Sequence, residues 1–273
     1  MPQRFWQSIS YKRELREFDL KITKYSLQTQ KPNIDVTLAV VADLHTKKVA
    51  PVIDALEKIK PDLILSPGDM FECFEERNDA INENGFDFFE QAVKIAPVYY
   101  CFGNHETEGE TSDEYPDVSG YKSIPPYVLE RLASLGVHTV FDTHEPVDGK
   151  ISIGGLLSGS NKESGEPCIE FVDKFSSLAE YKILLCHHPE YYEKYLAEKD
   201  VDLIISGHAH GGQWRIFGRG VFAPGQGLFP KYTSGLHDGR FIISRGCSNS
   251  TRPIPVPRFF NPKEVLEVHI KSE

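Results

Sequence analysis

Five short apolar runs, each closed by polar residues, constrain the fold of this chain more than any other feature. They indicate buried strands at residues 35–42, 62–66, 98–102, 181–186 and 201–206. Segments with helical spacing lie between them at residues 49–60, 76–95, 125–135, 171–178 and 190–199. This order predicts an α/β fold with packed sheets and helices outside them. A polar, acidic loop is expected at residues 106–120.

The residues directly after these strands are of the kinds that bind metal ions. Each strand is followed by Asp, Asn or His, namely Asp43, His45, Asp69, Asn104, His105, His187, His208 and His210. Ligands of α/β sheets bind beyond the carboxyl ends of the strands. If the strand ends are neighbours, these side chains therefore converge on one place.

Each cluster also has a purely structural interpretation. An Asp after a strand often caps a helix, and Gly68-Asp69 or Gly103-Asn104 suits a turn. The pair His187-His188 before a proline suits the entry to a helix. The glycine-flanked pair His208 and His210 is harder to explain in this way. Five such clusters at five strand ends favour a shared metal site.

Seven of these side chains form a donor set for two divalent ions. Three offer carboxylate or amide oxygens and four offer imidazole nitrogens, namely Asp43, Asp69, Asn104, His45, His187, His208 and His210. Mixed nitrogen and oxygen donors without thiolate suit Mn, Fe or Zn, and they suit Ca or Mg poorly. Two ions about 3.5–4 Å apart need a bridging carboxylate. Asp69 is the candidate because it is central in the order.

These residues resemble, in order, the five sequence blocks of the calcineurin-like metallophosphoesterases. The blocks are D-L-H (43–45), G-D (68–69), G-N-H-E (103–106), His187 and G-H-A-H (207–210). The later segments L-F-P-K-Y-T-S-G (228–235) and I-S-R-G (243–246) resemble the bacterial subgroup that includes YkuE- and YaeI-like phosphoesterases. The resemblance implies a four-layer α/β/β/α sandwich with two mixed sheets flanked by helices. No proline-rich or serine-rich linker divides residues 1–273, so we expect one domain with a catalytic core at about 36–270.

The resemblance assigns a role to each site residue. It implies that Asp43, His45, Asp69 and His210 bind the first ion, and that Asp69, Asn104, His187 and His208 bind the second. The implied reaction is hydrolysis of a phosphate ester, either a phosphodiester or a pyrophosphate, by a hydroxide that bridges the two ions. His105, oriented by a carboxylate, would protonate the leaving oxygen.

Two departures from the family pattern affect the rim of the expected pocket. Residues 46–48 are Thr-Lys-Lys, where a glycine is common, and His188 stands where asparagine is common. His188 either contacts substrate or has a structural role. Arg215 is a second candidate for contact with substrate.

Two alternatives to this function come from the same fold. A nuclease would need a basic groove, and the net charge of −10 argues against a large nucleic-acid surface. A scaffold without catalysis would have lost ligand residues, whereas all the ligand positions are filled here. The expected partner is therefore a phosphorylated small molecule or a lipid-linked substrate.

The N-terminal residues 1–17 form a basic arm that also carries Phe5, Trp6, Ile9 and Tyr11. This arm is either solvated or anchored at a membrane surface. It lacks the apolar core of a secretory signal, which predicts a cytoplasmic location with peripheral membrane contact as a further hypothesis. A second aromatic and basic strip at residues 217–236 either covers a sheet edge or receives the lipid or nucleotide part of a substrate.

Overall fold

A computed structural model of the chain describes residues 20–45, 47–74, 78–107, 124–158, 166–249 and 257–273. The basic arm expected at residues 1–17 lies outside the described residues, as does Thr46. Within the described ranges, no helix is both long enough and apolar enough to cross a bilayer.

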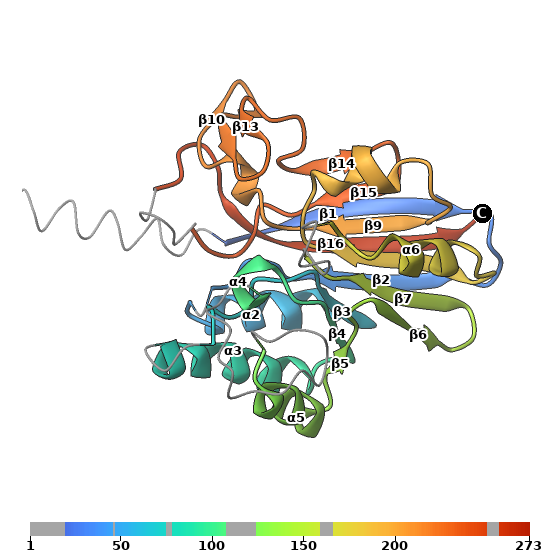
Figure 1. The fold of residues 1–273 in the computed structure, drawn as a ribbon, viewed down its shortest axis with the longest axis horizontal. Helices are drawn as coiled ribbons and strands as arrows, with labels where there is room; N and C mark the ends of the chain where they lie inside the picture. Colours follow the sequence, from blue (N-terminus) through green and yellow to red (C-terminus); the bar gives the residue numbers. More distant parts are fainter. Residues whose placement is uncertain (1–19, 46, 75–77, 108–123, 159–165, 250–256) are drawn as a thin grey trace, which may run out of the picture.

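The described chain forms two sheets of six strands each (Figure 1). The first sheet has the order β1 (Leu20–Thr29), β16 (Lys263–Ser272), β2 (Asp35–Val40), β3 (Leu63–Ser66), β4 (Val98–Tyr100) and β5 (His138–Thr139). The second has the order β14 (Gly235–His237), β15 (Phe241–Ile243), β9 (Leu203–Ser206), β8 (Tyr181–Cys186), β7 (Ile151–Leu156) and β6 (Thr143–Val147).

Both sheets are mixed, with parallel strands at their centres. In the first sheet β2, β3 and β4 are parallel, while β16 runs antiparallel to β2. In the second sheet β7, β8, β9 and β15 are parallel, and the outer strands β6 and β14 are antiparallel to their neighbours. Parallel neighbours end at the same edge of a sheet, so each sheet presents several carboxyl ends together.

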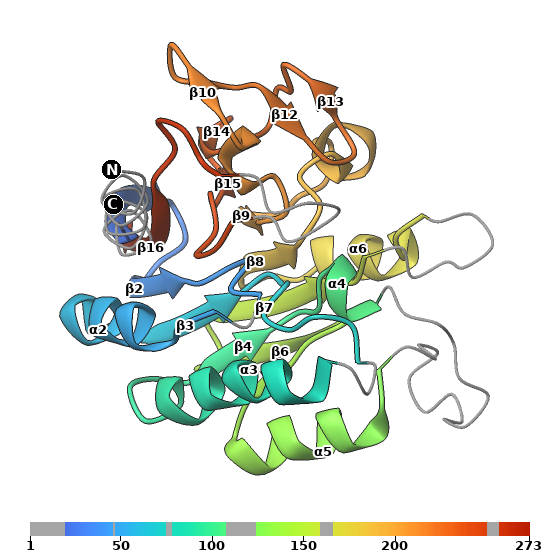
Figure 2. The same cartoon turned by 90° about the vertical axis from the view of Figure 1, so that its left-hand side faces the viewer.

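Helices cover the outer face of each sheet, which gives four layers (Figures 1 and 2). The helices α2 (Ala50–Ile59), α3 (Asp79–Ala92) and α5 (Pro126–Leu135) lie on the first sheet, and α6 (Ile169–Ser176) with the helical turn Tyr192–Leu196 lies on the second. On β8, Ile183 and Leu185 belong to the hydrophobic core that includes the first sheet, whereas Leu184 belongs to the core that includes α6. This alternation is the two-residue period of a strand buried on both faces. The expected α/β/β/α sandwich is confirmed.

Two segments differ from a simple sandwich of sheets and helices. Residues Asn104–Thr107 form a short helix, α4, although the polar loop was expected to begin at Glu106. Glu106 is fully buried there, because it binds backbone N–H groups rather than solvent. After β9 the chain makes two small hairpins, β10 (Arg215–Ile216) with β11 (Arg219–Gly220), and β12 (Phe222–Ala223) with β13 (Gly227–Leu228).

Candidate metal centre

The predicted ligands lie where the carboxyl ends of both sheets meet. Asp43, Asp69 and Asn104 follow the adjacent strands β2, β3 and β4, while His187 and His208 follow the adjacent strands β8 and β9. The backbone N–H of His208 donates a 2.9 Å hydrogen bond to Oδ1 of Asp43, which links the two edges directly. Asp43 therefore does not cap the next helix, whose N-cap residue is Val49.

One group of donor atoms combines Asp43, His45 and His210, which lie within 4.8 Å of one another. The Nε2 atoms of His45 and His210 are 3.4 Å apart. Nε2 of His210 is 3.7 Å from Oδ1 of Asp43. These three residues are the ones expected, together with Asp69, around the first ion.

A second group combines Asp69, His187 and His208 within the same distance. Nε2 of His187 is 3.0 Å from Oδ2 of Asp69. The same Oδ2 atom is 3.7 Å from Nε2 of His45, so Asp69 lies between the two groups. Asn104 begins α4 directly before His105, whose backbone N–H donates to Oδ1 of Asp69 at 3.0 Å.

The backbone at these residues is held in an unusual conformation. Five of the predicted ligands have positive φ angles, namely Asp43 (51°), His45 (46°), Asp69 (57°), His208 (65°) and His210 (45°). This left-handed region is uncommon for residues other than glycine and costs roughly 1–3 kcal/mol at each position. Such strain persists at functional sites, where it aims side chains that regular strands and helices would direct elsewhere.

Two glycines allow the backbone to approach the carboxylates closely. A Cβ atom on Gly103 would lie 2.2 Å from Oδ1 of Asp69, and one on Gly207 would lie 2.8 Å from Oδ2 of Asp43. Both distances are shorter than any real carbon–oxygen contact of this kind. Glycine is therefore required beside each carboxylate.

The electrostatics of the two groups suit metal ions. Burial alone would raise the pKa of Asp69, but the imidazoles of His187 and His105 lower it well below its usual range. Burial, together with neighbouring cationic groups, holds the pKa of His208 and of His210 well below the ordinary value. These two imidazoles are therefore neutral at pH 7, which is the form that binds metals.

An orphaned oxygen provides an independent test of the fit. Oδ2 of Asp43 is fully buried and has no hydrogen-bond partner in the described part of the chain. A buried carboxylate oxygen without a partner is costly unless a cation satisfies it. The donor set, the neutral imidazoles of His208 and His210, and this oxygen all fit divalent ions.

His105 lies beside the two groups and pairs with an acidic residue that the sequence did not single out. Its Nδ1 is 2.9 Å from Oε2 of Glu72, which follows β3 by six residues. Burial would lower the pKa of His105, but the carboxylates of Asp69 and Glu72 raise it to about 9. The ring is therefore protonated at neutral pH and can donate a proton.

Glu106 is the second acidic residue whose role only the structure reveals. Its carboxylate accepts five hydrogen bonds, from the backbone N–H groups of Asp69 (3.1 Å), Met70 (2.6 Å), Phe71 (2.9 Å) and Gly103 (2.8 Å) and from the hydroxyl of Tyr100 (2.7 Å). The donors come from the end of β4 and from the loops after β3 and β4. Glu106 therefore fixes Asp69 relative to α4.

Replacing this carboxylate by its amide should destabilise the protein. In Glu106→Gln, the side-chain NH2 faces backbone donors, and at least one buried N–H loses its acceptor. We expect the free energy of unfolding to fall by about 2–5 kcal/mol in urea titrations. Glu83→Gln is the matched control, because Glu83 forms an exposed pair with Arg131 whose loss costs less than about 1 kcal/mol. Equal stability of the two variants would contradict the role given to Glu106.

The two residues expected to contact substrate differ in their surroundings. His188 borders the second group, since its ring centroid is 4.2 Å from that of His208. Nδ1 of His188 is 2.9 Å from Oε1 of Glu190. The guanidinium of Arg215 instead donates to the carbonyls of Gly211 (3.0 Å) and Gly218, so it braces the chain after His210.

Two residues from the last segment also reach the centre, and no sequence pattern indicated them. Nη2 of Arg258 lies 3.3 Å from Nδ1 of His210. Nδ2 of Asn261 donates to the carbonyl of His210 at 2.7 Å and to that of Gln213 at 3.1 Å. Both residues fix His210 from outside the donor groups.

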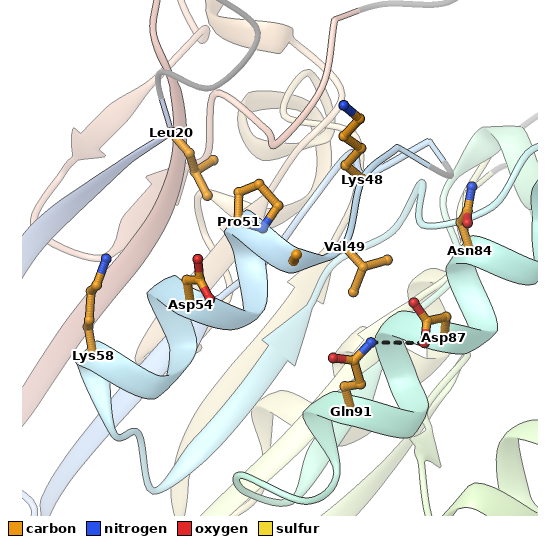
Figure 3. Close-up of a pocket in the computed structure, with 10 residues that line it drawn as sticks. Leu20, Lys48, Val49, Pro51, Asp54, Lys58, Asn84, Asp87 and Gln91 are labelled. Atoms are coloured by element: carbon orange, nitrogen blue, oxygen red, sulfur yellow. Dashed lines mark hydrogen bonds between the residues drawn. The ribbon is translucent and has the colours of Figure 1, made fainter. Parts of the chain in front are cut away.

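A separate pocket of about 640 Å³ lies between α2 and α3 (Figure 3). Its lining is largely polar and includes Lys48, Asp54, Lys58, Asn84, Asp87 and Gln91. Lys48, which was expected at the rim of the substrate pocket, lines it, but none of the predicted metal ligands does. The pocket is therefore distinct from the metal centre.

Residues 36–212 match the profile of the calcineurin-like phosphoesterases, and this range contains every predicted metal ligand. The chain belongs to this family. The calcineurin-like phosphoesterases are metal-dependent hydrolases, so membership implies bound divalent ions and catalysis of phosphoester hydrolysis.

Several bacterial relatives share most of the chain. YpbG of Bacillus subtilis (strain 168) is 25% identical over 240 residues, which cover 86% of this chain and 82% of YpbG. A metallophosphoesterase of Aquifex aeolicus (strain VF5) is 25% identical over 281 residues and 95% of each chain. Phosphodiesterase YaeI of Escherichia coli (strain K12) is 30% identical over 183 residues, covering 64% of this chain and 61% of YaeI. The family relation thus extends to the YaeI-like phosphoesterases.

Proposed function

We propose that this calcineurin-like phosphoesterase hydrolyses a phosphodiester or pyrophosphate bond at a centre of two divalent ions. The observation that carries the proposal is the position of Asp69. Its Oδ2 atom lies 3.7 Å from Nε2 of His45 in one donor group and 3.0 Å from Nε2 of His187 in the other. A carboxylate shared by two donor groups is what a pair of ions about 3.5–4 Å apart requires.

The proposed ligands divide between the two groups. Asp43, His45, Asp69 and His210 would hold one ion, and Asp69, Asn104, His187 and His208 the other. The donors are nitrogen and oxygen, so Mn, Fe or Zn suits them. Because both sheets supply ligands, neither sheet would bind the pair alone, and we treat the chain as one domain.

Bound ions would neutralise the phosphoryl oxygens and supply a nucleophilic oxygen at neutral pH. The protein's own residues then orient the reaction. His105 is held by Glu72 and is protonated, so its ring can donate a proton to the leaving oxygen as the ester bond breaks. Glu72 orients the ring of His105 and stabilises its protonated form.

The preference for a diester rests on relatives and on the charge of the chain. YaeI is named a phosphodiesterase, and a Synechococcus relative that is 26% identical over 207 residues is named a probable cyclic nucleotide phosphodiesterase. The net charge of −10 disfavours a long nucleic acid as substrate. A small or lipid-linked phosphodiester fits both observations.

Metal content and substrate preference test the proposal together. We expect elemental analysis of the purified protein to find about two ions of Mn, Fe or Zn per chain. Bis-p-nitrophenyl phosphate should be hydrolysed faster than p-nitrophenyl phosphate, and EDTA should abolish both activities. Mn²⁺ should then restore the activity and raise the melting temperature, because an ion that binds only the folded chain stabilises it.

The outcomes of this experiment separate the candidate functions. Turnover of single-stranded DNA in Mn²⁺ at a rate above that of bis-p-nitrophenyl phosphate would indicate a nuclease. Two bound ions without turnover of any of these esters would indicate a scaffold. A protein that stays free of metal in excess Mn²⁺ and Zn²⁺ would contradict the dinuclear centre.

A further inference from the structure

Three phenylalanines near the small hairpins combine strain with exposure. Phe217, Phe229 and Phe260 have φ angles of 49°, 52° and 52°. Their exposed fractions are 103%, 75% and 90%. A bulky residue in the left-handed region is a strained outlier, and an exposed ring gains nothing from the protein core in return. The described part of the chain therefore does not offset this strain by burying the three rings.

Five further apolar side chains extend this surface. They are Trp214 (45% exposed), Ile216 (55%), Phe222 (47%), Leu228 (71%) and Phe259 (44%). Together with the three phenylalanines they form what we call the hairpin surface. Apolar patches of this kind on a protein surface mark sites of interaction.

Backbone hydrogen bonds join the segments of the hairpin surface into one unit. The N–H of Val221 donates to Trp214 (2.9 Å), the N–H of Phe229 donates to Val221 (2.8 Å), and the N–H of Arg215 donates to Phe259 (3.0 Å). Figure 2 shows β10, β12 and β13 together, far from α2, α3 and α5. The segments that carry these residues thus lie on one side of the molecule.

The charge of this segment is opposite to that of the protein. Residues 203–237 contain no Asp or Glu, although the chain has 40 acidic residues and a net charge of −10. Arg215, Arg219 and Lys231 lie within the same segment. Aromatic rings interleaved with cations are the combination that binds the interface of an anionic bilayer.

We propose that the hairpin surface docks the protein on an anionic lipid bilayer. The three exposed phenylalanines would enter the headgroup region, and the exposed Arg219 would face lipid phosphates, while Arg215 braces the hairpin and Lys231 pairs with Glu193. The first hairpin begins at Arg215, shortly after the turn His210–Gly212, and Asn261, which follows Phe260, binds the His210 carbonyl. A docked protein would therefore hold its metal centre close to the bilayer surface.

The pocket between α2 and α3 on a second copy of the chain is a poor receptor for this surface. Rings that project from turns need an apolar pocket on a protein partner. The pocket between α2 and α3 is lined mainly by charged and polar side chains (Figure 3), so it would not receive a phenylalanine ring. A lipid interface needs no such complementary pocket.

Sedimentation with lipid vesicles tests the proposal. The assay contains EDTA, so vesicle binding is measured without bound metal and without turnover. The native chain should sediment with vesicles of phosphatidylcholine and phosphatidylglycerol at 3:1 and much less with pure phosphatidylcholine. Phe217→Ser with Phe229→Ser should reduce the partition coefficient about tenfold or more, because two rings no longer leave water. The matched control is Ile81→Ser with Tyr127→Ser, two exposed positions on α3 and α5.

Further readouts make the result decisive. Thermal unfolding should show that both double variants are folded. With Trp6→Phe, the only tryptophan left is Trp214, whose emission should shift to shorter wavelength on anionic vesicles. Native-like sedimentation of the phenylalanine variant would assign binding to another part of the chain and overturn the proposal. A native dimer that the same variant converts to monomer, without vesicle binding, would also overturn it.

Discussion

An Asp69→Asn protein should lose at least one of its two metal ions and hydrolyse bis-p-nitrophenyl phosphate about 10³–10⁴-fold more slowly than the native chain. The reason is the position of Asp69 between the two donor groups, 3.0 Å from His187 and 3.7 Å from His45. An amide has one ligand oxygen and no charge, so it cannot bridge two cations as a carboxylate does. Metal analysis and steady-state kinetics measure the two losses separately.

The matched control for this variant is Asp54→Asn, because Asp54 is exposed on α2 and lies outside the centre. Circular dichroism should show that Asp69→Asn is folded, so that lost activity reflects lost metal. Full metal content and native turnover in Asp69→Asn would remove the observation on which the dinuclear proposal rests. Loss of metal without loss of activity would also contradict the dinuclear proposal.

His105→Ala should keep its metal ions. Its loss of turnover should be larger for substrates whose leaving group must be protonated. For a glycerophosphodiester, whose leaving alkoxide is a strong base, we expect a loss of about 10²–10⁴-fold in kcat. For bis-p-nitrophenyl phosphate the loss should be much smaller, because p-nitrophenolate leaves without protonation. A merely structural role for His105 would reduce both rates equally. His144→Ala, on β6 and outside the centre, should change neither rate.

Replacing Glu72, the partner of His105, should change the pH dependence of activity in a direction that can be predicted. Glu72 is one of the groups that raise the pKa of His105 to about 9, so Glu72→Gln should lower that pKa. A proton donor is lost as the pH rises through its pKa. The alkaline limb of the kcat/KM profile should therefore move to lower pH in Glu72→Gln. An unchanged limb would show that His105 is not the group that titrates there.

The sheet strands and the kinds of metal-binding residue were predictable because their signals are local. Buried parallel strands appear as apolar runs, and the residues directly after β2, β3, β4, β8 and β9 lie at a sheet edge by geometry alone. The layered fold then results from the alternation of strands and helices. The turn at α4 was missed, since four residues carry no periodic pattern.

The charged partners around the centre were not predictable, because they are joined only through space. Glu72 meets His105 across 33 positions of sequence, and Arg258 meets His210 across 48. Neither contact follows from spacing along a strand or a helix. The hairpin surface was not predictable for the same reason. Its aromatic residues can be read in the sequence, but their exposure and backbone strain depend on how the turns fold.

By itself, the amino-acid sequence determined which strands are buried and which ligand-type residues stand at their ends, because both depend on near neighbours along the chain. Only the tertiary structure decided how far Asp69, the bridging candidate of the sequence, lies from His45 and His187, that Glu106 holds the surrounding loops, and that three phenylalanines are exposed. These features depend on how two sheets pack and how irregular loops close. Side chains distant in sequence meet there, and no local pattern specifies the distances between them.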